Sequence, residues 1–175
     1  PAMFALRAVL ASTLTPSWGM YAGYELYEHR AFKEGGEEYM DSEKYEIKVR
    51  DWEGAGKKGL TLAPFIALLN AIRKEHPALQ RLRNLIFHET DSDAIIAYSK
   101  REGKDLVMVV VNLDPSFAQG TTVHWNMEAL GLHSNEFAVK DLLDGSTMTW
   151  SPHTYVSLNP TRPVGKVAHI VSVKI

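Results

Sequence analysis

The hydrophobic pattern of this chain changes at about residue 85, and the pattern after that point restricts the possible folds most. Apolar and polar residues there alternate in short runs separated by turn sequences such as Asp144-Gly145-Ser146. Alternation with period two places the apolar side chains of a strand on one face. The predicted strands are 85–88, 94–99, 106–111, 121–125, 137–142, 147–150, 154–158 and 167–174. Short strands at this spacing predict an antiparallel β-sandwich over residues 83–175.

The run Val107–Val111 is apolar at every position. A strand that alternates has one solvated face, whereas a continuous apolar run is typical of a strand buried on both faces. We therefore expect residues 106–111 to form a central strand of the sheet.

Residues 1–82 have a different pattern. Apolar residues recur at helical spacing over 4–14 and again over about 60–75, where Pro77 ends the helix. Residues 17–25 form a short segment that is rich in aromatic residues and interrupted by glycine. This pattern is typical of a buried strand that runs into a loop. Residues 28–58 are polar, and a loop of this length inside a compact domain is usually functional.

These first elements do not complete an α/β domain. One strand and two helices cannot bury their apolar faces in any of the usual layered architectures. A whole (β/α)8 barrel needs roughly 250 residues, whereas the chain has 175. We therefore expect residues 1–82 to be the end of a longer domain. The start Pro1-Ala2-Met3, without a leading methionine, favours a chain whose beginning lies elsewhere.

The composition excludes several classes of protein. The chain has no cysteine, so it has neither disulfides nor a thiolate zinc site, and its apolar content of 45% excludes intrinsic disorder. With a formal charge of −2, the chain lacks the positive charge that a nucleic-acid-binding protein usually carries. It also contains no uninterrupted run of ~18 apolar residues, the length that a membrane-spanning helix needs. The histidines show no i, i+4 pair. We expect no metal and no cofactor, and the missing cysteines favour a cytoplasmic location.

The order of the elements resembles the end of an enzyme of glycoside hydrolase family 13, the α-amylase superfamily. In that family a (β/α)8 barrel precedes a C-terminal antiparallel β-sandwich. Residues Leu14–Glu25 resemble its eighth barrel strand and Ile66–Leu79 its last barrel helix, while Asp105–Leu113 and Asp141–Gly145 resemble its sandwich strands. The resemblance implies the last strand and helices of an α/β barrel in residues 1–82, followed by the all-β sandwich.

Residues Asp41–Trp52 narrow the resemblance. They are similar to the bacterial maltosyltransferases of this superfamily, which extend α-1,4-glucan from maltose 1-phosphate. The resemblance implies a retaining transfer of maltosyl units from α-maltose 1-phosphate to the non-reducing end of an α-1,4-glucan, with release of phosphate. It also implies that the intact protein is a homodimer, and that the rest of the barrel is a partner of this chain.

In that family an Asp nucleophile, a Glu acid/base and a stabilising Asp lie on earlier parts of the barrel. All three would precede residue 1, so we assign no catalytic residue here and expect the isolated chain to be inactive. One substrate contact does transfer by position, the adjacent pair Lys44-Tyr45. An ammonium pairs with phosphate, and a phenol offers a flat face and a donor. The alternative for both residues is an ordinary solvated loop.

For the other candidate functional residues, a purely structural role is the alternative. Glu25 and Glu28 resemble an acid/base pair, but we favour hydrogen bonds that orient a loop. Arg50-Asp51-Trp52 would either line the substrate cleft or form an ion pair capped by an aromatic ring, and both interpretations stay open. The aromatic residues would stack on sugars or pack in the core, and we favour the core for Trp18, Tyr21, Trp125, Trp150 and Tyr155.

Two other functions share most of these features. Another α-amylase-type hydrolase, or a trehalose-forming enzyme, would differ mainly in residues 41–52. A stand-alone carbohydrate-binding β domain with a helical extension would need only the strands. The last hypothesis leaves the apolar faces of residues 4–14 and 60–72 uncovered, which counts against it.

Overall fold

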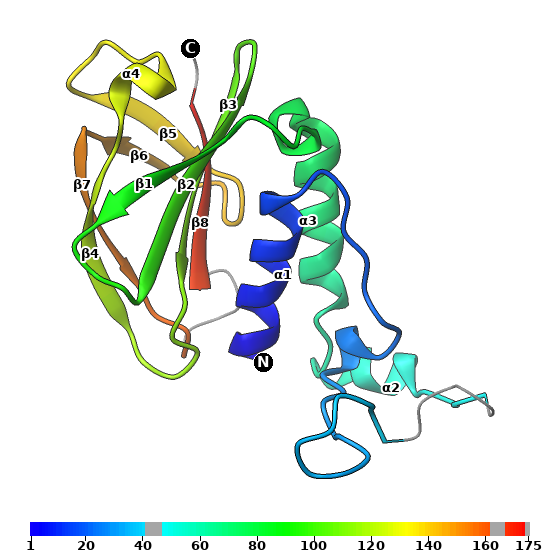
Figure 1. Cartoon of the computed structure of the whole chain (residues 1–175). Helices are drawn as coiled ribbons and strands as arrows, with labels where there is room; N and C mark the ends of the chain where they lie inside the picture. Colours follow the sequence, from blue (N-terminus) through cyan, green and yellow to red (C-terminus); the bar gives the residue numbers. More distant parts are fainter. Residues whose placement is uncertain (41–46, 162–166, 174–175) are drawn as a thin grey trace.

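The computed structural model describes residues 1–40, 47–161 and 167–173. Figure 1 shows an antiparallel sheet that curls towards a barrel, with two helices against one of its faces. The helices are α1 (Ala2–Leu14) and α3 (Ala63–Glu75). Residues 20–40 and 47–60 extend past the N-terminal ends of these helices, away from the sheet (Figure 1). Within the described ranges, no helix is long and apolar enough to cross a membrane.

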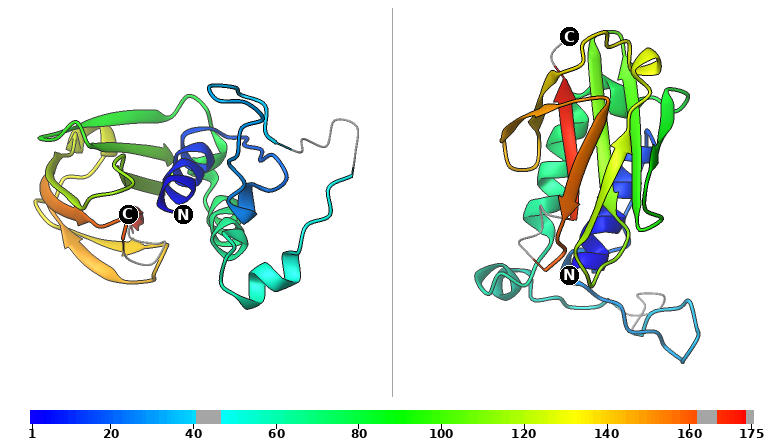
Figure 2. Two further views of the ribbon diagram at one scale, coloured as in Figure 1. Left: turned by 90° about the horizontal axis from the view of Figure 1, so that it is seen from below. Right: turned by 90° about the vertical axis from the view of Figure 1, so that its left-hand side faces the viewer.

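The predicted strands are confirmed, with ends shifted by a few residues. The strands are β1 (Leu85–Thr90), β2 (Ile95–Glu102), β3 (Asp105–Asn112), β4 (Gln119–His124), β5 (Phe137–Asp141), β6 (Thr147–Trp150), β7 (His153–Leu158) and β8 (Ala168–Val173). They follow the order β6-β5-β8-β3-β2-β1-β4-β7, and every pair is antiparallel. The view from below in Figure 2 shows how the sheet curls around its interior.

Strand β3 lies between β8 and β2 and is buried on both faces, as the sequence predicts. Its odd-numbered valines, Val107, Val109 and Val111, face the helices. Its even-numbered apolar residues, Leu106, Met108 and Val110, face the interior of the curl. The continuous apolar run therefore supplies two separate cores.

Helices α1 and α3 bury their apolar faces against this outer side of the sheet. Leu6, Val9 and Leu69 are almost fully buried in the same core as Tyr98. The hydroxyls of Thr13 and Tyr98 share a hydrogen bond of 2.5 Å between α1 and β2. The expectation that residues 4–14 and 60–72 would have uncovered apolar faces is therefore wrong, because the sheet has a second apolar face that covers them.

Residues 17–25 do not form the predicted strand. A strand needs a neighbour for its backbone hydrogen bonds, and no described strand runs beside this segment. Residues 20–28 instead contain a short 3-10 helix, Tyr24–Leu26, between two residues with positive φ, Gly23 at 99° and Tyr27 at 59°. The long loop also contains local structure. Residues Ala31 and Tyr39 form an isolated bridge, and α2 covers Trp52–Lys57. A short helix that the sequence analysis missed, α4, covers Met127–Leu130.

Candidate functional site

The turn at residues 23–28 forms the base of the candidate site, and aromatic contacts fix it to α1. The ring of Phe4 lies 4.9 Å from that of Tyr24 and 5.4 Å from that of Tyr27. The Tyr24 hydroxyl donates a hydrogen bond to the Phe4 carbonyl. Burial raises the pKa of both phenols, with the nearby Arg7 partly opposing this shift at Tyr24. Both phenols are therefore protonated and able to donate.

Glu25 connects this turn to the start of α3. Its carbonyl accepts hydrogen bonds from the Leu62 amide at 2.8 Å and the Thr61 hydroxyl at 3.1 Å. Its carboxylate accepts a hydrogen bond from the Gly23 amide at 3.1 Å. These are bonds that orient the loop, in agreement with the structural interpretation of this residue.

Glu28 is held by two cations from the other end of the loop. Arg50 donates from Nε to Oε1 at 2.9 Å and from Nη2 to Oε2 at 3.3 Å, and the Lys48 ammonium lies 3.2 Å from Oε2. The hydrogen bonds from Arg50 hold the pKa of the Glu28 carboxyl below its ordinary value, with a smaller contribution from Lys48. Glu28 is therefore ionised at neutral pH, which suits an anchoring role better than that of a general acid.

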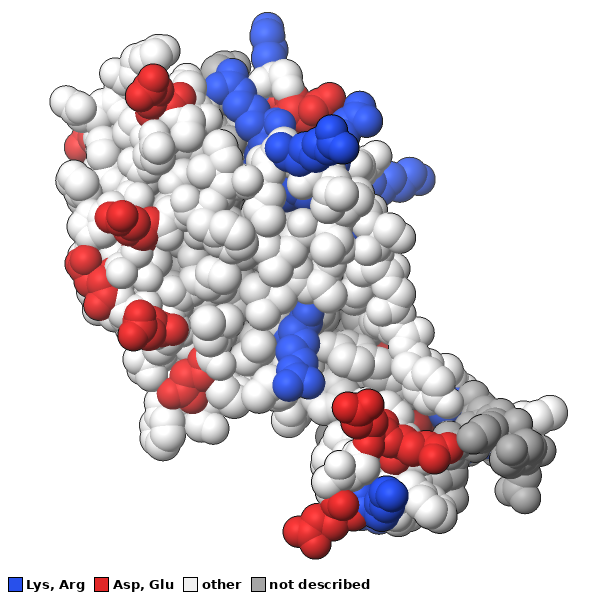
Figure 3. All heavy atoms as spheres, in the orientation of Figure 1, with Lys and Arg blue, Asp and Glu red and all other residues white. Residues whose placement is uncertain are grey.

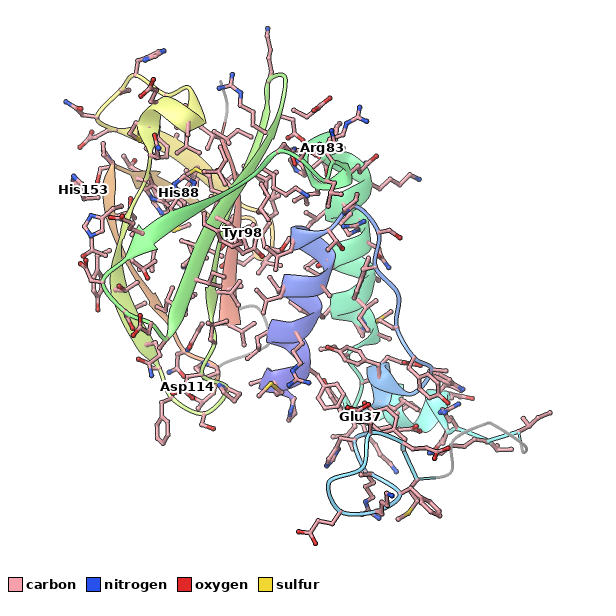
Figure 4. The ribbon with its side chains drawn as sticks, viewed as in Figure 1. Glu37, Arg83, His88, Tyr98, Asp114 and His153 are labelled. Atoms are coloured by element: carbon pink, nitrogen blue, oxygen red, sulfur yellow. The ribbon has the colours of Figure 1, made fainter. Side chains whose placement is uncertain are left out.

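A cavity of about 300 Å³ opens between this turn and the following residues. It combines phenols, cations and a carboxylate, all of which bond to hydroxyl groups. It is lined by Leu26, Tyr27, Glu28, His29, Arg30, Tyr39, Met40 and Lys48. Figure 4 shows the segment, labelled at Glu37, beyond the ends of the helices.

A second cavity of about 400 Å³ lies between residues 20–25 and α3. It is more apolar, and it is lined by Met20, Tyr21, Ala22, Glu25, Ala63, Ile66, Ala67 and Asn70. The Asn70 side chain accepts a hydrogen bond from the Trp18 indole at 3.1 Å, which ties residues 17–20 to α3.

Comparison with known proteins places the chain in a family. A family model described as "GLGE, C-terminal" matches residues 87–173. The α-1,4-glucan:maltose-1-phosphate maltosyltransferase 2 of Streptomyces coelicolor is 54% identical over 168 residues, which cover 95% of this chain. Residues 87–173 therefore belong to the GLGE C-terminal family.

Two further members of the maltosyltransferase family show the extent of the match. The Corynebacterium glutamicum enzyme is 54% identical over 97% of the chain, and that of Mycobacterium tuberculosis is 48% identical over 98%. The chain spans about a quarter of the length of these relatives, between 24% and 25%.

Solved structures of α-amylases have the same fold. A maltogenic α-amylase from Thermotoga neapolitana matches 99% of this chain and 37% of its own with a TM-score of 0.67, at 13% identity. An α-amylase from Geobacillus thermoleovorans matches 99% of this chain and 33% of its own with a TM-score of 0.66, also at 13% identity. At a sequence identity this low, the similarity shows a common fold and nothing more.

The predicted substrate residues, Lys44 and Tyr45, lie outside the described residues. Met40 and Lys48, which precede and follow them in the sequence, both line the first cavity. Lys44 and Tyr45 as substrate contacts stay a prediction.

Residues 50–52 agree in part with one of the two interpretations that the sequence left open, because Arg50 forms an ion pair. Arg50 pairs with Glu28, whereas Asp51 accepts a hydrogen bond from the Gly54 amide at 2.8 Å and caps α2. Trp52 has 49% of its surface exposed. Neither Asp51 nor Trp52 is among the residues that line the first cavity. The Arg50–Glu28 pair joins residues 22 apart, and no sequence pattern pointed to it.

The aromatic residues separate into two groups. Trp18 packs partly against the helix-side core, and Trp125 stacks on Trp150 inside the curl with ring centroids 5.4 Å apart, as expected. Core packing is wrong for Tyr155, which is 70% exposed. Tyr21 is 52% exposed in this chain, and its packing in the end of a barrel stays a prediction. Tyr155 is on the outward side of β7, where alternate residues are exposed. That alternation was visible in the sequence.

Proposed function

We propose that this chain is the C-terminal part of an α-1,4-glucan:maltose-1-phosphate maltosyltransferase. The intact enzyme transfers maltosyl units from α-maltose 1-phosphate to the non-reducing end of α-1,4-glucans and releases phosphate. The observation that carries the proposal is the 48–54% identity, over nearly the whole chain, to curated relatives of that name. Because the chain spans about a quarter of their length, the activity belongs to the intact protein.

In this proposal residues 1–82 are the last part of the catalytic barrel and residues 83–175 are the β-sandwich. The long segment that leaves the body of the molecule supports this division. It exposes large apolar side chains that a neighbouring part of a barrel would cover. They are Met20, Tyr21, Phe32, Tyr39, Met40, Ile47, Val49, Trp52 and Leu60.

Lys44 and Tyr45 contact maltose 1-phosphate in this proposal. The support is the cavity whose lining residues Met40 and Lys48 precede and follow them in the sequence. The phenols of Tyr27 and Tyr39 and the cation of Arg30 at this cavity are suitable partners for sugar hydroxyls and phosphate oxygens. The Arg50–Glu28 pair holds the base of the loop in place, so that the substrate-binding residues are positioned before substrate arrives.

The nucleophile, the acid/base and the stabilising Asp would come from parts of the relatives that this chain does not span. The isolated chain is therefore inactive in this proposal. We also propose a homodimer for the intact enzyme and a cytoplasmic location, where the absence of cysteine is in keeping with a reducing compartment. Light scattering on the intact enzyme tests the dimer.

The function is tested with the intact enzyme, maltose 1-phosphate and a malto-oligosaccharide acceptor. Release of inorganic phosphate that depends on the acceptor supports the proposal, whereas hydrolysis of starch without use of maltose 1-phosphate overturns it. The substrate contacts are tested with K44Q and Y45F, with K33Q as a control in the same loop. The expected result is a KM for maltose 1-phosphate raised at least about tenfold, a loss of 1.4 kcal/mol, in the first two variants only.

A further inference from the structure

The outward face of strands β1, β4 and β7 carries a pair of histidines far in sequence from the candidate site. His124 on β4 and His153 on β7 are register partners, and the register partner of His124 on β1 is Glu89. Register partners of an antiparallel pair project from the same face. Figure 4 shows His153 on the outside of the sheet, whereas His88 lies nearer the interior.

The two imidazole rings face each other through the same nitrogen. The Nδ1 atoms of His124 and His153 are 2.8 Å apart, and the ring centroids are 5.0 Å apart. At this distance one Nδ1 carries a proton and the other accepts it, because two bare lone pairs would repel. The two Nδ1 atoms therefore point at each other across this hydrogen bond, which makes both nitrogens neighbours on the outer surface.

Asp91 determines which nitrogen of His124 is free. An oxygen of Asp91 lies 2.8 Å from His124 Nε2 and accepts its proton in a hydrogen bond. The neutral His124 ring is then left with a bare lone pair on Nδ1, directed at His153. A carboxylate that accepts from the distal nitrogen of an imidazole is the usual support of a metal-binding histidine, since it fixes the tautomer and makes the ligand more basic.

We propose that His124 and His153 form a two-histidine site for a divalent transition-metal ion of the zinc, nickel or copper class. With metal–nitrogen bonds of about 2.0–2.1 Å, two coordinated nitrogens are about 3.0–3.4 Å apart. Metal binding therefore requires the two nitrogens to separate by a few tenths of an ångström and both rings to tilt until their lone pairs converge on the ion. Moving the His153 proton from Nδ1 to its exposed Nε2 frees the second lone pair. Water completes the coordination sphere.

The surroundings favour a cation. The side of the molecule on which Figure 4 places His153 carries acidic side chains in Figure 3, with no Lys or Arg among them in that view. In the sheet register, the acidic residue Glu89 is the partner of His124. Within the described residues, no three His, Asp or Glu side chains converge as a ready-made metal site, which agrees with two protein ligands, since Asp91 bonds to the far side of the His124 ring. Imidazole nitrogen selects zinc, nickel and copper over magnesium and calcium.

The test titrates the full chain with Zn²⁺ by calorimetry and with Cu²⁺ by electron paramagnetic resonance. The expected result is one equivalent of bound metal, with coupling to two nitrogens in the copper spectrum and no binding of Mg²⁺. H124Q and H153Q each lower the zinc affinity at least tenfold and remove one coupled nitrogen. H133Q, at an exposed histidine in the loop after α4, leaves both unchanged.

The D91N variant tests the role of Asp91 while both metal-binding histidines stay in place. The expected loss of zinc affinity is about 10–100-fold, because the amide no longer accepts the Nε2 proton as a carboxylate does. Far-UV circular dichroism verifies the fold of each variant. Zinc affinity in H153Q equal to that of the unchanged chain, or a copper spectrum with a single coupled nitrogen, overturns the proposal and assigns the binding to scattered surface groups.

Discussion

Arg50 donates a hydrogen bond to each carboxylate oxygen of Glu28, from Nε to Oε1 at 2.9 Å and from Nη2 to Oε2 at 3.3 Å. A further hydrogen bond from Arg50 Nη2 reaches the Ala22 carbonyl at 3.2 Å. The Arg50 side chain is only 5% exposed. One guanidinium therefore joins residue 50, which follows Lys44 and Tyr45 in the sequence, to the turn at residues 22–28.

Replacing Arg50 by lysine should destabilise the chain, because an ammonium cannot reproduce the two-pronged contact. The expected loss in the free energy of unfolding is about 1.5–3 kcal/mol. Arg81 is the matched control, since it pairs with Glu102 at 3.2 Å but is largely exposed. R81K should change stability by less than about 0.5 kcal/mol. Urea unfolding of both variants decides the matter, and equal losses would contradict a structural role for Arg50.

Gly23 permits the close approach of Glu28 and should not tolerate a side chain. A Cβ at this position would lie 2.2 Å from Glu28 Oε2, and φ is +99°. Gly35 has a φ of +71° but open space around it, so it isolates the backbone contribution. G35A should cost about 1 kcal/mol and G23A clearly more, because the clash adds to the strain. Thermal unfolding compares them, and a G23A variant as stable as G35A would show that Glu28 moves away without cost.

His88 should make stability depend on pH. Its Nδ1 accepts a hydrogen bond from the Asn126 amide at 3.1 Å and its Nε2 is 2.8 Å from the Ser99 hydroxyl. Burial lowers the pKa of His88 to about 4. Because the folded-state pKa lies below the unfolded one, the neutral ring stabilises the fold above pH 6.5, and this contribution is lost as the pH falls towards 4.

The expected loss from this residue between pH 7 and pH 5 is about 2 kcal/mol. Urea unfolding at the two pH values should show a smaller pH dependence in H88Q than in the unchanged chain. H133Q, at an exposed position, should keep the full dependence. An unaltered slope in H88Q would place the titrating group elsewhere.

Trp150 and Tyr155 should respond very differently to truncation. Trp150 is 4% exposed and stacks on Trp125, whereas Tyr155 is 70% exposed. W150A should cost about 3–5 kcal/mol through the cavity it leaves, and Y155A less than about 0.5 kcal/mol. Chemical denaturation measures both. A large loss in Y155A would mean that its ring contributes to stability through its contact above Gly120.

The β part of the fold was largely predictable, because period-two alternation and turn residues are local signals. The alternation in β7, where Thr154, Val156 and Leu158 are buried and Tyr155 is not, also contained the position of Tyr155. The helices' packing was harder to infer. The apolar run in β3 indicated two buried faces, but nothing local identified α1 and α3 as the layer that covers the outer one.

The candidate site was less predictable for a physical reason. Residues 17–25 have the composition of a strand, but strand formation depends on a neighbour that the local pattern does not reveal. The ion pair between Glu28 and Arg50, and the bonds from Leu62 and Thr61 to Glu25, join residues far apart in the chain. Only the resemblance of residues 41–52 pointed to this part of the molecule as a substrate-binding segment.

The central claim is that the chain is part of an enzyme that transfers maltosyl units from maltose 1-phosphate. The most direct measurement follows phosphate release and acceptor mass together, with the intact enzyme, maltose 1-phosphate and maltohexaose. The account predicts one phosphate for each transfer and products that grow in steps of two glucose units. Products that shorten, or that grow without phosphate release, would contradict it.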